Sequence, residues 1–200
     1  MKSKGYIIAA AGYVAAALLW PALSLAAQPS SELNYDFVDL GVTFGDIDTA
    51  GDDVDFSTFD VNGSWGVHKN IALIGRVGVG EIDTSGDIDT TELAFGINAH
   101  FPLTDRIDLV VPVAIEWAEY EAGSFEDDDT GFSLGFGVRA LASPAWEFNG
   151  GLRYIDIFGE DDLGVVGGAR WHISSLFSLS ADATIGDDAS GVRLGGRFSF

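Results

Sequence analysis

The residues best suited to acid–base chemistry are the three histidines, His68, His100 and His172. A general base must reach its substrate directly and normally works beside a nucleophile or an orienting acid. The chain has no cysteine. In the acidic segments of the chain, no serine has both a histidine and an acidic residue beside it. We therefore predict no catalytic residue, no enzymatic activity and no cofactor.

The acidic segments offer oxygen ligands to divalent cations. Asp46, Asp48 and Gly51 resemble the start of a calcium-binding loop, but Ala50 occupies a ligand position and Ser57 stands where a bidentate Glu is needed. We therefore predict no dedicated metal site. Weak binding of Ca²⁺ or Mg²⁺ by clustered carboxylates is one alternative, and a merely solvated acidic surface or adaptation to a saline habitat is the other.

Six of the seven arginines share their sequence parity with acids and amides, while apolar residues hold the opposite parity. Successive side chains of a β-strand point to opposite faces, so each predicted strand has one charged and one apolar face. Charges removed from bulk water need partners, and Arg offers carboxylates a rigid fork. We predict an interior polar network formed by Arg76, Glu92, His100, Asp108, Glu116, Arg139, Glu147, Arg153, Arg170, Asp182, Arg193 and Arg197.

Turn positions suggest which of these side chains meet. Counting back from the predicted turn, His100 is expected to face Asp108, and Glu92 to face Glu116. Two like charges opposite each other are unfavourable unless a cation lies between them. Arg76 is the candidate bridge.

The elements that position these residues have a period of two and no sustained helical spacing. Ten such segments follow one another, and most reach the length that a tilted membrane-spanning strand needs. An even number suits a closed antiparallel barrel. The sequence therefore predicts an all-β fold, a closed antiparallel up-and-down transmembrane β-barrel of ten strands, with eight as the fallback, over residues 36–45, 55–67, 71–82, 88–101, 107–120, 131–142, 146–156, 163–173, 176–186 and 191–200.

Connections and aromatic residues favour this barrel over a β-sandwich, the nearest soluble alternative. Short links alternate with acidic segments at residues 46–55, 83–87, 121–130, 156–162 and 187–190, as periplasmic turns alternate with extracellular loops. Two aromatic girdles are expected at the membrane interfaces. One comprises Trp65, Phe101, Trp146, Trp171, Phe177, Phe198 and Phe200, and the other Phe44, Phe56, Trp117, Phe132 and Tyr154.

One residue conflicts with a closed sheet. Pro112 lies within a predicted strand, although proline cannot donate to the ladder of hydrogen bonds between strands. We predict a β-bulge at this position.

The N-terminus has the three parts of a secretory signal. Lys2 and Lys4 are followed by an apolar stretch at residues 7–19 and by small residues that allow cleavage after Ala26 or Ala27. We predict a signal peptide over residues 1–27 and a barrel domain over residues 28–200; the alternative is a retained membrane helix. All 31 acidic residues follow residue 27, against eight Lys and Arg, so we predict no nucleic-acid partner.

The leader, the segments LNYDFVDLGVTFG and GSWGVHKNIALIGRVGVG, and the closing GGRFSF together resemble the small outer-membrane β-barrel proteins, which include the OmpA transmembrane domain. The order of segments is also similar to a narrower group labelled the sulfation-dependent quorum factor family. The resemblance implies a bacterial outer-membrane location, lipid contact and recognition by the barrel-insertion machinery. Phe198 and Phe200 resemble the C-terminal insertion signal of such barrels.

Barrels of about eight strands are filled by side chains, whereas aqueous channels are typical of larger ones. The leading functional hypothesis is therefore a structural or surface-interaction role, with acidic extracellular loops and a largely filled, salt-bridged lumen. The alternative is a narrow porin-like channel for small solutes.

Overall fold

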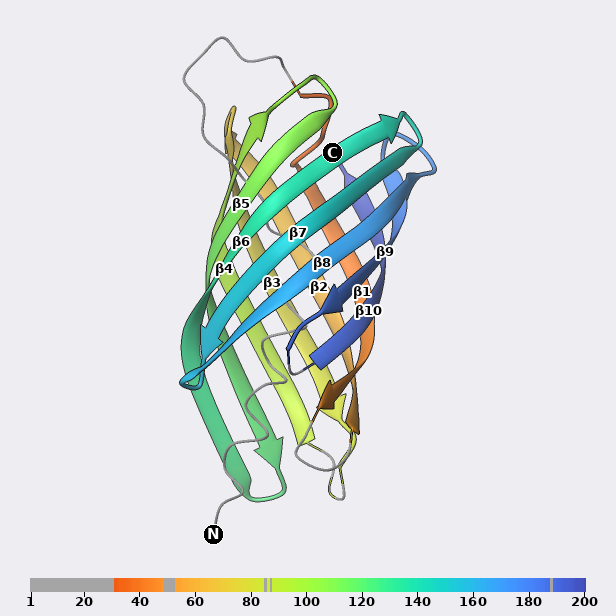
Figure 1. Ribbon diagram of the computed structural model, residues 1–200. Helices are drawn as coiled ribbons and strands as arrows, with labels where there is room; N and C mark the ends of the chain where they lie inside the picture. The colour runs from red at the N-terminus through yellow and green to blue at the C-terminus, as the bar shows by residue number, and fades with distance from the viewer. Residues whose placement is uncertain (1–30, 49–52, 85, 87, 188) are drawn as a thin grey trace.

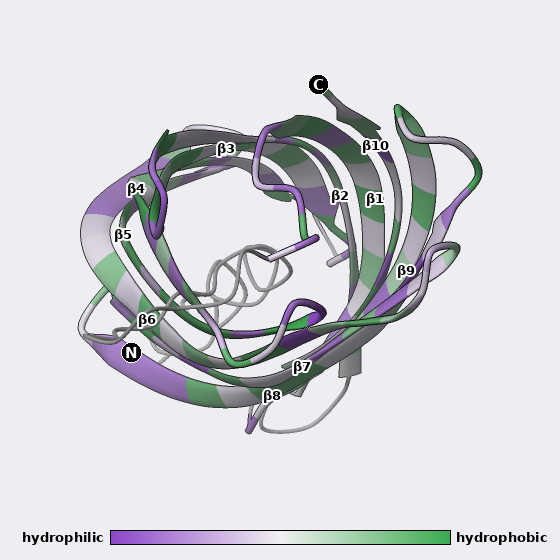
Figure 2. Cartoon of the chain, turned by 90° about the horizontal axis from the view of Figure 1, so that it is seen from above, coloured by the Kyte–Doolittle hydropathy of each residue, from purple (hydrophilic) through white to green (hydrophobic). Residues whose placement is uncertain are grey.

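The computed structural model describes residues 31–48, 53–84, 86, 88–187 and 189–200. The predicted signal peptide lies outside these residues. Ten antiparallel strands form a closed barrel in which each strand pairs with its neighbours in sequence and β1 pairs with β10 (Figures 1 and 2). The strands are β1 (Phe37–Asp48), β2 (Asp53–His68), β3 (Ile71–Ile82), β4 (Ile88–Pro102), β5 (Ile107–Ala122), β6 (Phe125–Ser143), β7 (Trp146–Ile157), β8 (Glu160–His172), β9 (Phe177–Ile185) and β10 (Ala189–Ser199).

The predicted ten-stranded fold is thus confirmed. None of the described residues forms a helix that could cross a membrane. The end of the barrel that carries the β1–β2, β3–β4, β5–β6, β7–β8 and β9–β10 connections is called the loop end below. The opposite end, where β1 begins and β10 finishes, is called the turn end.

Apolar and polar side chains separate by strand parity. Val113 and Phe136 point away from the lumen and are 44% and 54% exposed, whereas Arg139, Arg153 and Arg170 are buried inside. A soluble protein would bury the first set and expose the second. This inverted distribution is the one that lipid requires of a barrel's outer surface.

Several acidic segments predicted as loops are instead strand. β5 and β6 meet at Gly123 and Ser124, and β7 and β8 meet at Phe158 and Gly159, so residues 121–130 and 156–162 mostly extend hairpins. Asp, Glu and Gly have low strand propensity, which made these segments look like loops. The pairing with neighbouring strands overrides that preference.

The predicted bulge at Pro112 is wrong. The β5–β6 register is the same at Val110↔Gly137 and Val113↔Leu134, with pairing absent at Val111 and Pro112 between them. Pairing of Pro112 with Asn98 on the β4 side continues without a shift. Because proline lacks an N–H, the ladder skips a step on one side and no extra residue is needed. Register shifts occur instead near the turn end, between Gly66 and His68 and between Leu141 and Ser143.

Two residues predicted in the aromatic girdles are also misplaced. Phe56 and Phe101 are each only 6% exposed, whereas Trp65, Trp146 and Phe44 lie on the outer surface. Phe56 has the inward parity of β2 and joins an apolar cluster at the loop end. Phe101 instead shares the outward parity of Phe95 and Ile97 on β4 and is nevertheless covered, so parity accounts for Phe56 but not for Phe101.

Candidate functional site

All twelve residues of the predicted polar network are buried inside the barrel. They fall into groups along the lumen, whose contacts join neighbouring strands as well as strands that are distant in sequence. The first group surrounds Asp39, which is fully buried and whose carboxylate lies 2.7 Å from Arg193 Nη2, 3.0 Å from Arg197 Nε and 3.5 Å from Arg170 Nη2. Arg193 Nη2 also lies 2.6 Å from Asp60 Oδ2, so this group links β1, β2, β8 and β10.

Asp39 was not among the predicted network residues although it is the centre of this group. Its signal was present in the sequence, because Asp39 stands between the outward residues Val38 and Leu40 and therefore has inward parity. Gly41 makes room for the group, since a Cβ at that position would overlap the Arg193 guanidinium. A small residue thus accompanies a long inward side chain.

The second group separates the two glutamates expected to face each other. Arg76 Nη1 lies 2.6 Å from Glu92 Oε2, and Arg153 Nη2 lies 2.8 Å from Glu116 Oε1. Ser133 Oγ donates a second hydrogen bond to Glu116 Oε1. Each glutamate therefore has its own arginine, and Arg153 reaches Glu116 from β7.

The register predicted for these residues was two positions off. Glu92 is opposite Ala118 and Glu116 is opposite Ala94, while His100 is opposite Val110. The predicted turn had the right length but was centred one residue too early, which moves each cross-strand partner by two positions. His100 Nδ1 still lies 3.9 Å from Asp108 Oδ2 because both side chains point into the lumen.

The third group lies near the turn end. Arg139 Nε lies 2.8 Å from Glu147 Oε1, and His172 Nε2 lies 3.4 Å from Glu147 Oε2. The Tyr35 hydroxyl donates to Asp108 Oδ2 at 2.7 Å. The guanidinium of Arg139 also lies over the Tyr35 ring, 4.6 Å from its centroid.

Tyr35 belongs to residues 31–36, a segment that precedes β1 and folds into the turn end. Leu33 and Tyr35 are buried there and pack with Ala72 and Leu141. Ser64 Oγ donates to the Tyr35 carbonyl, and both terminal nitrogens of Arg139 donate to the Asn34 carbonyl. The segment therefore occupies part of the lumen as a fixed element.

The loop end of the lumen is filled by a loop-end cluster of buried apolar side chains. Tyr120 and Phe158 are in contact within it, with ring centroids 5.3 Å apart. Apolar contact of this kind excludes water from the end of the charged interior. The buried members are Ile47, Phe56, Ile82, Ile88, Ala118, Tyr120, Ile155, Ile157 and Ala189, with Val54, Ala122 and Phe158 packed against them.

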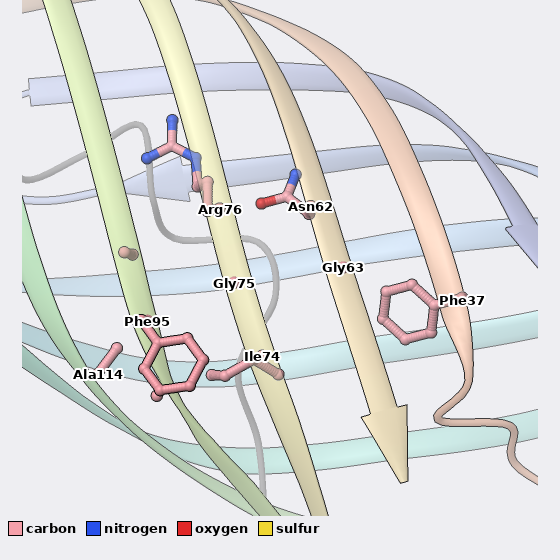
Figure 3. Close-up of a pocket in the computed structure, with 10 residues that line it drawn as sticks. Phe37, Asn62, Gly63, Ile74, Gly75, Arg76, Phe95 and Ala114 are labelled. Carbon is pink, nitrogen blue, oxygen red and sulfur yellow. The ribbon is translucent and has the colours of Figure 1, made fainter.

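Two hollows frame this interior. A cavity of about 10 Å³ lies between Asn62, Arg76 and the β2–β4 wall, which is about the space of one water molecule (Figure 3). A wider hollow of about 520 Å³ opens at the turn end beside Tyr35, His68 and Lys69. This wider hollow is thus bordered by residues 31–36 and His100 rather than by the arginine–carboxylate groups of the lumen.

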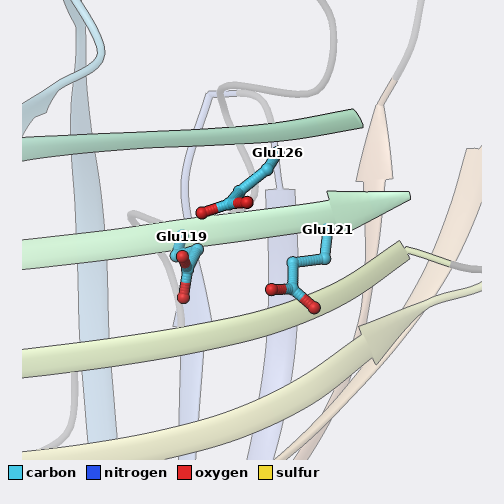
Figure 4. A group of neighbouring side chains, drawn as sticks. All are labelled: Glu119, Glu121 and Glu126. Atoms are coloured by element: carbon cyan, nitrogen blue, oxygen red, sulfur yellow. The ribbon is translucent and has the colours of Figure 1, made fainter. Parts of the chain in front are cut away.

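Three carboxylates gather on the β5–β6 hairpin beyond Trp117. Oxygens of Glu119, Glu121 and Glu126 lie within 4.8 Å of one another (Figure 4). Desolvation on the strand surface, together with the charges of Glu121 and Glu126, raises the pKa of Glu119 above its ordinary value. The cluster is a site of mutual repulsion that protons or cations would relieve.

The histidines do not gather into one site. His68 ends β2, His172 ends β8 and His100 lies close to the end of β4, so all three lie near the turn end. The ring of His100 is buried against Tyr35, with centroids 3.6 Å apart.

The comparison with protein families agrees with this geometry. The model of the outer membrane protein beta-barrel domain matches residues 15–198, nearly the whole chain. This chain belongs to the outer-membrane β-barrel family. Its location is accordingly the bacterial outer membrane. Comparison with the curated proteins gave no match.

Solved structures of other outer-membrane proteins are similar to this chain at low identity. The β domain of the Bordetella autotransporter BrkA is 11% identical, with a TM-score of 0.50 over 82% of this chain and 99% of that one. The KdgM porin in complex with disordered oligogalacturonate is 10% identical, with a TM-score of 0.46 over 82% and 99%. Ail, the attachment invasion locus protein of Yersinia pestis, is 12% identical, with a TM-score of 0.40 over 84% and 99%. At these identities the likeness concerns the fold alone.

Proposed function

We propose that this outer-membrane barrel has a structural or surface-interaction role and does not conduct solutes. The supporting observation is that its lumen is occupied in three successive layers. The loop-end cluster fills one end, arginine–carboxylate groups fill the middle, and residues 31–36 occupy the turn end. A hydrated path would have to displace all three.

Planar-bilayer recording tests this proposal. The purified full chain is expected to give no stable stepwise conductance, because its polar groups are paired with each other rather than with a column of water. A double variant that truncates the loop-end cluster, Phe56→Ala with Tyr120→Ala, controls for insertion and is expected to raise the frequency of brief openings. Stable steps from the unaltered chain would support the alternative, a narrow porin-like channel.

The acidic loop end is proposed to face the outside of the cell. The first strand, β1, begins at the turn end and the last strand, β10, finishes there. In outer-membrane barrels the end with the short turns faces the periplasm. Among the described residues no Lys or Arg lies at the loop end, because the six network arginines are inside and Lys69 and Arg106 are in turn-end connections. The exposed surface there would attract cations and repel anionic lipid headgroups.

Weak divalent-cation binding at this surface is part of the proposal. Glu119, Glu121 and Glu126 offer oxygens but no enclosed coordination shell, so Ca²⁺ is expected to bind only at millimolar concentration. Calorimetric titration of the full chain with CaCl₂ measures this. Micromolar affinity would instead require an ordered site.

Phe198 and Phe200 are proposed to form the insertion signal read by the barrel-insertion machinery. Both side chains are exposed on the lipid-facing side of the barrel, 55% and 62% respectively. Replacing both with Ser is expected to slow assembly in cells and to leave refolding into lipid vesicles nearly unchanged. Equal loss in both assays would indicate a purely structural role.

No catalytic role is proposed. His68, His100 and His172 lie near the proposed periplasmic end, away from the acidic surface. An esterase or protease assay that lost activity on substitution of one of them would contradict this.

A further inference from the structure

The β5–β6 hairpin extends well past the neighbouring β7–β8 hairpin at the loop end (Figure 1). β6 pairs with β5 from Phe125 onward, but its pairing with β7 begins only at Phe132↔Asp156. Within the described part of the chain, the seven residues 125–131 therefore have a strand partner on one side only. Alternate residues of this stretch direct their N–H and C=O groups to the open side.

The open edge begins where β7 turns away from β6. A Cβ at Gly131 would overlap the Asp156 carbonyl oxygen, so β7 still lies directly against β6 at the base of the edge. The Phe158 N–H then donates to Asp129 Oδ2 at 2.7 Å, which fixes the β7–β8 turn beside the base of the edge. Beyond Asp129 the edge is exposed to solvent.

Charge sets the kind of strand that this edge accepts. Glu126, Asp127, Asp128 and Asp129 alternate between the two faces of the hairpin, so an added strand meets carboxylates on both faces. A second copy of the same edge would place like charges opposite each other, which disfavours self-pairing. A strand rich in Lys or Arg would meet complementary charges instead.

A shorter open edge on β8 is less suited to this role. β8 pairs with β9 only from Val165, leaving Glu160–Gly164 unpaired on that side. The Asp187 N–H donates to Asp162 Oδ1, however, and the Ile185 carbonyl lies beside Gly164. The β9–β10 connection therefore partly covers this edge.

We propose that residues 125–131 form a docking edge for an extended basic peptide segment, which adds to β6 as an antiparallel or parallel strand. Main-chain hydrogen bonds supply the binding, and the exposed carboxylates of Glu126, Asp127 and Asp128 select a cationic sequence. The inference rests on the proposed surface-interaction role, with the loop end facing outward.

The test uses the full chain in lipid nanodiscs and the synthetic peptide KTKVKTKVK. A second peptide of the same sequence, N-methylated at backbone positions on both edges, keeps the charge but cannot pair. The first peptide is expected to bind saturably and to slow hydrogen exchange at alternate amides within residues 125–131. The methylated peptide is expected to bind about tenfold more weakly, since it offers charge without a ladder.

Matched variants distinguish binding at the β6 edge from nonspecific attraction to the acidic surface. Glu126→Gln with Asp128→Asn is expected to weaken binding about fivefold, because two cross-strand charge pairs are lost. Glu81→Gln with Asp89→Asn removes the same charge from the β3–β4 hairpin, whose strands are paired on both sides, and is expected to change affinity less than about twofold. Equal effects of the two variants, equal binding of the two peptides, or absence of protection at residues 125–131 would each overturn the proposal.

This failure is distinguishable from failure of the proposed function. Stable conductance would refute the closed lumen without affecting the open edge. Absent peptide binding would refute the edge and leave the lumen closed.

Discussion

Asp39→Asn is the substitution expected to damage this barrel most for the smallest change in shape. The Asp39 carboxylate is fully buried and is the nearest anionic partner of both Arg170 and Arg197. Its neutralisation leaves two buried guanidinium groups without their closest counter-charge. Breaking a buried ion pair from one side costs about 3–5 kcal/mol, and we expect a loss in this range.

Asp60→Asn is the matched control. Arg193 keeps Asp39 at 2.7 Å, and the amide oxygen that the substitution introduces can still accept one of the hydrogen bonds that Arg193 donates to the Asp60 carboxylate, so the expected loss is smaller, about 1.5–3 kcal/mol. Adding Arg197→Gln to Asp39→Asn removes one positive charge and rebalances the group. The double variant is therefore expected to be at least about 1 kcal/mol more stable than the sum of its single effects predicts.

Reversible urea unfolding in lipid vesicles, followed by tryptophan fluorescence, measures these free energies of unfolding. The reasoning is refuted if Asp39→Asn costs no more than Asp60→Asn. It is equally refuted if the effects of Asp39→Asn and Arg197→Gln simply add.

Three further predictions concern the wall and the hairpin. Arg76→Ala is expected to destabilise the barrel by about 3 kcal/mol in the same assay, because Glu92 is left buried without its arginine at 2.6 Å; an unchanged unfolding midpoint would contradict this. Gly96→Ala is expected to destabilise, because its Cβ would overlap the Val113 carbonyl oxygen, whereas Gly75→Ala, with its nearest atom 3.8 Å away, is expected to stabilise by about 0.5–1 kcal/mol; the same sign for both would count against the packing argument. The pKa of Glu119 is raised in the folded hairpin, so the contribution of Glu119 to stability is fully present below pH 4.5, the ordinary pKa of Glu, and is lost as pH rises through the folded value; a carboxyl NMR titration midpoint for Glu119 at or below 4.5 would contradict this.

The alternation of side chains was enough to predict the strand number and the face of most residues. Every network residue from Arg76 to Arg197 has the parity that the structure places inside. Parity depends only on the position of a residue within its own strand, so an error in a turn does not change the predicted face. Cross-strand partners are harder to predict, because they depend on the register between strands. A two-residue error in the β4–β5 register changes the partner of His100 from Val110 to Asp108.

The apolar filling at the loop end was not predicted, although its signal is in the sequence. Ile47, Ile82 and Ile157 hold the inward parity near strand ends, where most inward residues elsewhere are polar. An apolar residue at an inward-facing position near a strand end therefore indicates that the lumen is closed there. The contribution of Tyr35 could not be inferred this way, because it lies outside any strand and depends on the tertiary contact with Asp108.

Acidic segments were misread for a related reason. Residues 125–130 have poor strand propensity and high charge, yet they pair with β5 along their whole length. Propensity describes an isolated segment, while pairing with an already formed strand supplies hydrogen bonds that outweigh it. The open edge of β6 follows from this extension and has no sequence signature of its own.

The central claim is that apolar side chains face lipid while ionised ones fill the interior, and methyl NMR in nanodiscs containing acyl-chain nitroxide lipids tests it most directly. The methyl signals of Val113 and Val165, which are 44% and 57% exposed, are expected to broaden strongly. Those of Val110 and Val166, which are buried inside the same strands, are expected to remain sharp. Broadening of Val110 and Val166 with sharp signals from Val113 and Val165 would contradict the account.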